Sequence, residues 1–161
     1  MKKLLIVLLI LFVAIQFIRP ERNISVTNGI EPNDISKKYG VPSEVYSTLK
    51  TSCFDCHSNN TVYPGYASVQ PLAWWINHHI NEGKHTLNFS AFASYPINRQ
   101  YRKLDNIIEQ IKENEMPLSS YTIIHKNAVL NDTQRQSIIN WATALMDSIK
   151  ATNPPDSLKR K

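Results

Sequence analysis

Apolar side chains recur at helical spacing in several stretches of the chain, most clearly across residues 97–115. In that stretch one face carries Ile97, Tyr101, Leu104, Ile107, Ile108 and Ile111, and charged residues occupy the opposite face. A stripe of this kind predicts an amphipathic helix packed against a core. Pro117 is expected to stop this helix.

Two shorter stretches have helical patterns with breaking residues at their ends. Residues 43–53 place Val45, Leu49 and a cysteine on one face, with Ser43 as the expected cap. Residues 72–83 are rich in tryptophan and histidine, and this helix is expected to stop at Gly83. A short helix over residues 33–40 is also expected.

The last helical pattern covers residues 133–150, with Asn131 or Asp132 as its cap. One face of it carries Ile138, Trp141, Ala142, Leu145 and Ile149. Residues 117–130 are expected to form a loop. The sequence has no sustained alternation of apolar and polar residues, so the predicted fold class is all-α.

The N-terminal run of apolar residues, 4–18, is interrupted only by Gln16 and has two cations at each end. As a helix it would span about 22 Å, which is short of a hydrocarbon core of about 30 Å. Lysine and arginine side chains can extend that reach. No small-residue cleavage site follows. We therefore expect residues 1–22 to be an uncleaved signal anchor, a single membrane helix.

The rest of the chain divides by composition into a linker (23–33), a domain (34–150) and a polar tail (151–161). The 161 residues carry a net charge of +5, of which residues 1–22 contribute +3. With only +2 left for the remainder and no nucleic-acid motif, we expect no nucleic-acid partner.

The only two cysteines lie in the segment "SCFDCHSNN", residues 52–60, as Cys53 and Cys56, and His57 follows at once. A disulfide between them would close a small, strained loop. Zinc usually takes four protein ligands, and the other histidines show no paired spacing. A thiol redox pair is expected in a βαβ context, which the pattern lacks.

The remaining use of Cys-x-x-Cys-His is covalent attachment of a c-type haem. Two thiols three residues apart can each bond one vinyl group of the ring, and the next histidine can supply an axial nitrogen to the iron. We therefore predict one haem c per chain. Such motifs receive haem outside the energy-coupling membrane, which places the domain in the periplasm, tethered to a bacterial inner membrane by one pass.

The second axial ligand is less constrained by the sequence. Met116 lies in "ENEMPLSS", beyond the expected helix end and before a proline, with enough chain after His57 to wrap around the ring. A methionine ligand suits an electron carrier. His125, His78 and His79 are alternatives. Arg99 and Arg102 are candidate partners for the haem propionates.

The order of the Cys-x-x-Cys-His motif, Met-Pro and a helix with tryptophan resembles class I cytochromes c. More specifically, "CFDCHSNNTVYP", "LAWWINHHINEG", "LNFS" and "EMPLSSYTIIHKNAVL" resemble the small bacterial haem-binding domain family, whose members have one N-terminal anchor helix. The similarity covers most of residues 50–130. It implies a cytochrome c-like fold, thioethers at Cys53 and Cys56, His57 as proximal ligand and Met116 as distal ligand.

These features predict a monohaem electron carrier rather than an enzyme, with a periplasmic or membrane redox partner. Two other functions stay open: a haem-based sensor with a free or labile distal position, and a peroxidase-type enzyme that uses His78 or His79.

Overall fold

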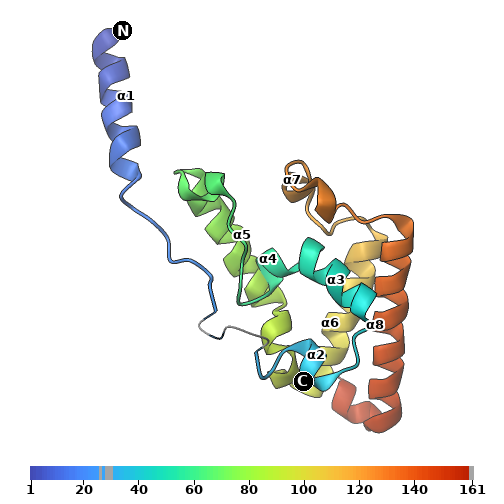
Figure 1. Cartoon of the computed structure of the whole chain (residues 1–161). Helices are drawn as coiled ribbons and strands as arrows, with labels where there is room; N and C mark the ends of the chain where they lie inside the picture. Colours follow the sequence, from blue (N-terminus) through green and yellow to red (C-terminus); the bar gives the residue numbers. More distant parts are fainter. Residues whose placement is uncertain (26, 28–30, 160–161) are drawn as a thin grey trace.

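The computed structural model describes residues 1–25, 27 and 31–159, and every regular element in these ranges is a helix (Figure 1). The α-helices are α1 (Lys2–Ile15), α2 (Ile35–Lys38), α3 (Ser43–Ser52), α4 (Phe54–His57), α5 (Leu72–Thr86), α6 (Ile97–Lys112), α7 (Ser119–Thr122) and α8 (Asp132–Thr152). The 3-10 helices are η1 (Gly65–Ser68), η2 (Phe89–Ser94), η3 (Lys126–Ala128) and η4 (Pro155–Leu158). The all-α prediction is confirmed for the described residues.

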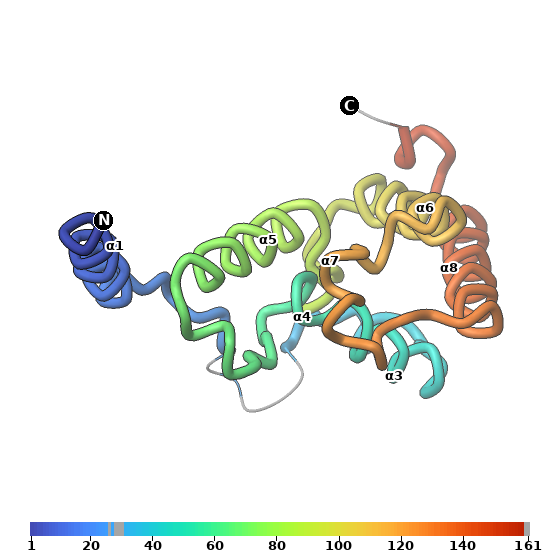
Figure 2. The backbone as a smooth tube through the Cα atoms, turned by 90° about the horizontal axis from the view of Figure 1, so that it is seen from above, coloured from blue at the N-terminus to red at the C-terminus, as the bar shows by residue number. Residues whose placement is uncertain are grey.

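Helices α6 and α8 pack side by side and run in opposite directions, and α3 lies against α8 (Figures 1 and 2). Their apolar faces meet in one core, to which η2 adds two phenylalanines. Its largest fully buried side chains are those of Ile35, Leu49, Phe89, Phe92, Leu104 and Ile138. The apolar stripes that were read from the sequence of these three helices therefore point inward as predicted.

Three element boundaries differ from the expectation. Helix α6 ends at Lys112, before Pro117, because Asn114 adopts a positive φ of 60°. Asparagine tolerates this left-handed conformation, which commonly ends helices. Helix α5 continues past Gly83 to Thr86. The expected loop 117–130 contains α7 and η3.

Of the two predicted helix caps, one is confirmed and one is wrong. Helix α8 begins with a capping box, in which the Asn131 side chain accepts from the Gln134 amide and the Gln134 side chain accepts from the Asn131 amide. This confirms Asn131 as the cap. Ser43, in contrast, is the first residue of α3, and Pro42 holds the cap position without a side-chain hydrogen bond.

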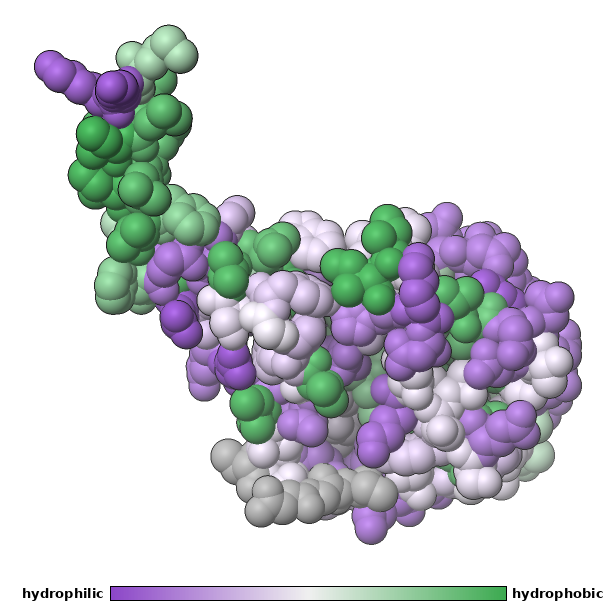
Figure 3. All heavy atoms as spheres, turned by 45° about the horizontal axis from the view of Figure 1, so that its top comes forward, coloured by the Kyte–Doolittle hydropathy of each residue, from purple (hydrophilic) through white to green (hydrophobic). Residues whose placement is uncertain are grey.

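The N-terminal helix α1 stands apart from the rest of the chain (Figures 1 and 2) and buries none of its residues. Apolar side chains cover its visible surface in Figure 3 except at the hydrophilic N-terminal end. It has only 14 residues, which corresponds to a rise of about 21 Å. Within the described ranges, no helix has both the length and the apolar character needed to cross a bilayer. The predicted membrane helix is therefore wrong, as is the single-pass inner-membrane location inferred from it.

The residue that follows α1, Gln16, is bonded to the segment before α5. The Gln16 side chain accepts from the amide of Gln70 at 2.9 Å and donates to its carbonyl at 3.3 Å. The Gln70 side chain in turn donates to the carbonyl of Ile18. These bonds attach the chain that follows Ile15 to the segment before α5.

The predicted linker and tail are both in contact with the domain. Asn23 donates from its side chain to Ser58 and Thr61, and the hydroxyl of Tyr63 accepts from its amide. Residues 26, 28–30 and 160–161 lie outside the described part, so the linker and tail are only partly seen. Within the tail, η4 packs on α6. The division into 1–22, 23–33, 34–150 and 151–161 stays a prediction.

Candidate functional site

One tight turn brings the two cysteines and the histidine together. Cys53 ends α3 and precedes α4, and its carbonyl accepts from the amides of Cys56 at 3.2 Å and His57 at 2.9 Å. Both thiols are free and half-buried. Helix α3 therefore delivers the first cysteine, and the single turn of α4 delivers the other two groups beside it.

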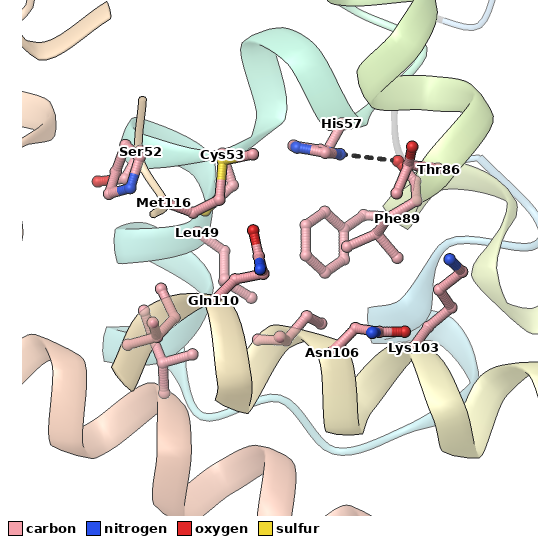
Figure 4. Close-up of a pocket in the computed structure, with 15 residues that line it drawn as sticks. Leu49, Ser52, Cys53, His57, Thr86, Phe89, Lys103, Asn106, Gln110 and Met116 are labelled. Carbon is pink, nitrogen blue, oxygen red and sulfur yellow. Dashed lines mark hydrogen bonds between the residues drawn. The ribbon is translucent and has the colours of Figure 1, made fainter. Parts of the chain in front are cut away.

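The imidazole of His57 is held by the backbone of the segment after α5. Its Nδ1 donates to the carbonyl of Leu87 at 3.0 Å, a bond drawn in Figure 4. Burial lowers the pKa of His57, although its hydrogen bond to the Leu87 carbonyl and the nearby backbone of Gly83 act in the opposite direction. The ring is therefore neutral near pH 7. With the proton on Nδ1, the lone pair on Nε2 is free to bind a metal.

Gly83 allows α5 to lie directly against α4. A Cβ at this position would be 2.5 Å from the carbonyl oxygen of Cys56, closer than atoms can approach. The absence of a side chain therefore brings the end of α5 near the cysteine turn. This placement also sets the Leu87 carbonyl opposite His57.

A mostly apolar cavity of about 340 Å³ opens beside these groups (Figure 4). Cys53, His57 and Met116 lie around its upper rim, and Phe89 projects into it. The remaining lining includes Leu49, Ile107, Ile111 and Ile138 from the core, with Lys103, Asn106 and Gln110 from the polar edge of α6. An apolar cavity with a few polar groups at its rim is typical of cofactor sites.

A second hollow of about 370 Å³ adjoins the first and shares Cys53, His57 and Met116 with it. Its own lining has more ionisable side chains, namely Asp55, Cys56, His78, His79, Glu82 and Tyr121. The two hollows together surround the cysteine turn on the side that faces Met116.

The structure separates the candidates for the second axial position. Met116 is half-buried, packs against the core and lines both hollows. His78 and His79 line only the second hollow. His125 lines neither, and its Nε2 is paired with the hydroxyl of Tyr66 at 2.7 Å.

The cation at the cavity is Lys103, which sequence reasoning missed. Arg99 and Arg102 do not line either hollow, and Arg99 lies over the ring of Tyr95 at 4.2 Å. Burial, followed by the nearby charges of Arg99 and Arg102, lowers the pKa of Lys103. No acidic residue of the described chain lines this first cavity. Counting helical positions could not decide which of three neighbouring cations faces inward.

A second feature missed from the sequence is the hydrogen bond from the Tyr121 hydroxyl to Asp55 Oδ2, at 2.7 Å. Asp55 lies between the two cysteines, and Tyr121 lies shortly after Met116. Burial and this hydrogen bond raise the pKa of Tyr121, so its hydroxyl keeps its proton. No pattern in the sequence links these two positions.

The donor set fits a haem better than the alternatives. Burial raises the pKa of Cys53 to about 12 and that of Cys56 to about 11, so both sulfurs are protonated thiols at neutral pH. A histidine nitrogen and a methionine sulfur border the same apolar space. In the ranges that the structure describes, no three His, Cys, Asp or Glu side chains are arranged to bind a metal ion, which leaves zinc without a ligand set.

Comparison with known proteins gives one match. The sequence model of a family described as a haem-binding domain matches residues 10–144, most of the chain. None of the curated proteins and none of the solved structures matches this chain.

Proposed function

Because the chain belongs to the haem-binding domain family, we propose that it carries its haem covalently, as one haem c, and serves as a one-electron carrier. The observation that carries this proposal is the cysteine turn. Two free thiols and a neutral imidazole with an available Nε2 lie within one helical turn at the edge of the two adjoining hollows.

In this proposal Cys53 and Cys56 hold the haem through thioether bonds, and His57 is the proximal ligand. The Leu87 carbonyl fixes the tautomer and orientation of the imidazole. Phe89 and the apolar faces of α3 and α6 exclude water from the ring. The cavity is open at one side, and covalent bonds would keep the haem in place without full enclosure by the chain.

Met116 is proposed as the distal ligand, because it borders both hollows together with His57. Lys103 is proposed to pair with a haem carboxylate, because it is the cation of the first cavity and has no acidic neighbour among the described lining residues. The order of these groups along the chain agrees with the resemblance to class I cytochromes c.

Bound haem iron supplies a one-electron couple whose potential depends on its axial ligands. The chain contributes two axial donors and a dry, apolar surround, an arrangement that favours electron transfer over substrate chemistry. The redox partner would be a protein with a complementary docking surface.

One observation favours a second candidate, a ligand-binding or peroxidase-type function. His78, His79 and Glu82 line the second hollow beside Met116 and could move protons to or from a bound ligand. Rapid binding of carbon monoxide by the reduced wild-type protein would favour this candidate. Turnover of hydrogen peroxide that is lost in His79→Ala would do so more strongly.

The test of covalent attachment is a double variant, Cys53→Ser with Cys56→Ser. We expect it to lose all haem that survives denaturing electrophoresis when it is made in a host with haem c maturation machinery, and its mass to equal that of the bare chain. Each single serine variant keeps one possible thioether and should retain reduced staining. A stained band in the double variant would overturn the proposal.

Met116→Leu is the matched control in the same cavity. It should keep haem that survives denaturation, because both cysteines are intact. It should lose the weak sulfur-to-iron absorption band of the oxidised protein. If the wild-type protein lacks this band, Met116 is not the distal ligand.

A further inference from the structure

The residues that follow Met116 are weakly held by apolar contacts from α7 onward. Helix α7, which follows Met116, buries none of its residues. Just beyond it, Ile123 and Ile124 are 66% and 59% exposed. Burial therefore stabilises α7 and the two isoleucines after it little, and polar contacts contribute to holding them in place.

The first such contact joins the segment to the cysteine turn itself. Tyr121 donates from its hydroxyl to Asp55 Oδ2 at 2.7 Å, and the amide of Val62 donates to Asp55 Oδ1 at 2.9 Å. Asp55 is half-buried, and no cation of the described residues forms an ion pair with it. Tyr121 is therefore one of two donors that replace water at this carboxylate, and hydrogen bonds to charged acceptors are the stronger kind.

A second contact ties the same segment to the chain that follows the cysteine turn. The ring of His125 stacks on Tyr121, with centroids 4.2 Å apart and an interplanar angle of 10°. Its Nε2 is paired with the Tyr66 hydroxyl at 2.7 Å. Tyr66 belongs to η1, so this hydrogen bond joins the segment after His57 to the segment after Met116.

We propose that Asp55 and Tyr121 are positioning residues, whose hydrogen bond clamps the Met116 segment onto the cysteine turn and so holds the methionine sulfur at the iron. Tyr66 and His125 support the clamp. This inference rests on the proposed distal role of Met116. It assigns a function to Asp55, one of the two residues between the cysteines, whose identity does not matter for haem attachment itself.

The consequence is a testable change in how often Met116 leaves its place. Carbon monoxide can bind the reduced protein only when the distal position is open, so its association rate reports the open fraction. Loss of one hydrogen bond to a charged group should raise this fraction about tenfold. The thioether bonds and His57 are untouched, so the haem content should not change.

The test compares the wild-type holoprotein with Tyr121→Phe, which keeps the ring and its stacking on His125. We expect about tenfold faster carbon monoxide association, a weaker sulfur-to-iron band in the oxidised form, and unchanged haem per chain. Tyr63→Phe is the matched control. It also removes a hydrogen-bonded hydroxyl, the acceptor for the Asn23 amide, but not one near Met116, and should behave as wild type.

A second variant, Asp55→Asn, keeps the size of the side chain and removes its charge. If the two residues act through one hydrogen bond, the double variant with Tyr121→Phe should be no faster than the faster single variant. Effects that multiply in the double variant would overturn the clamp. So would a Tyr121→Phe protein whose band and association rate match those of the wild type.

Hydrogen exchange of the full-length holoprotein separates failure of the clamp from failure of the distal assignment. Tyr121→Phe should speed exchange of amides in residues 118–125 and leave those of α6 and α8 unchanged. If the wild type lacks the sulfur band but this local exchange increases, Met116 is not the ligand and the clamp holds the segment for another reason. If exchange is unchanged, the clamp is overturned whatever the ligand.

Discussion

The Cys53 and Cys56 thiols lie where burial disfavours the charged sulfur. The pKa values of about 12 and about 11 are well above the value of about 8.5 for a free cysteine. Since the thiolate is the reactive form, a haem-free chain should keep both sulfurs reduced and unmodified. This keeps them available for attachment and opposes a disulfide between them.

We therefore predict slow alkylation of the haem-free, folded chain. Near pH 8 the reaction with iodoacetamide should be at least about tenfold slower than for the same chain in concentrated urea. The rate should rise steeply as the pH approaches 11. Mass spectrometry over a time course measures both rates, and equal rates in the folded and unfolded chains would contradict the burial of the thiols.

The same pKa values have a consequence for stability. Both folded values lie above the unfolded value, so the thiols stabilise the haem-free fold fully below about pH 8.5. This contribution is lost as the pH rises toward the folded values. Holoprotein, whose sulfurs would be thioethers, should not show this loss.

At the scale of single residues, the motif could be predicted and its surroundings could not. Cys53, Cys56 and His57 are contiguous, so their relation is local and readable from spacing. Lys103 faces the cavity while Arg99 and Arg102 do not, and this depends on how α6 is rotated against the core. The pairing of Asp55 with Tyr121 joins positions that only the folded chain brings together.

At the scale of elements, the contact between α4 and α5 depends on a glycine. Gly83→Ala would place a methyl group against the Cys56 carbonyl oxygen. Although alanine favours a helix by about 1 kcal/mol, separating the two helices should outweigh this gain. We expect a net loss of about 1–3 kcal/mol in the free energy of unfolding, measured in urea.

Gly40→Ala is the matched control, because a Cβ there would have no atom within 4 Å. It should be neutral or slightly stabilising, by up to about 1 kcal/mol. If both alanine variants unfold at the same urea concentration, the stability of the fold does not depend on the close approach of α5 to the cysteine turn.

The element boundaries show why local signals are incomplete. Gly83 looks like a helix stop, because glycine is common just beyond helix ends. Its role here is a tertiary contact inside α5, which has no local signature. The faces of α6 and α8 were predicted correctly because the 3.6-residue period is itself local.

At the scale of the whole molecule, none of the residues of α1 is buried, whereas the segment that follows it is bonded to the domain. Removal of residues 1–15 should change the free energy of unfolding by no more than about 0.5 kcal/mol. Removal of residues 1–24 also deletes the bonds of Gln16, Arg22 and Asn23. It should cost about 2 kcal/mol or more.

Urea unfolding followed by tryptophan fluorescence compares the two truncated chains with the full chain. A large loss of stability on removing residues 1–15 alone would contradict the isolation of α1.

The wrong prediction of a membrane helix comes from reading the apolar run without its tertiary contacts. The apolar run was read from the sequence, but the helix ends where Gln16 binds Gln70, 54 residues away.

The hydrogen bond between His57 and the Leu87 carbonyl comes from main chain, so no side-chain replacement at residue 87 removes the acceptor. The Leu87 amide is bonded to the Gly83 carbonyl, which closes the last turn of α5 at 2.8 Å. The angle of the imidazole is thus encoded by helix register. Inserting one residue between Gly83 and Leu87 would rotate the Leu87 carbonyl by about 100° around the helix axis. The His57 ring would then lose the hydrogen bond that fixes its orientation.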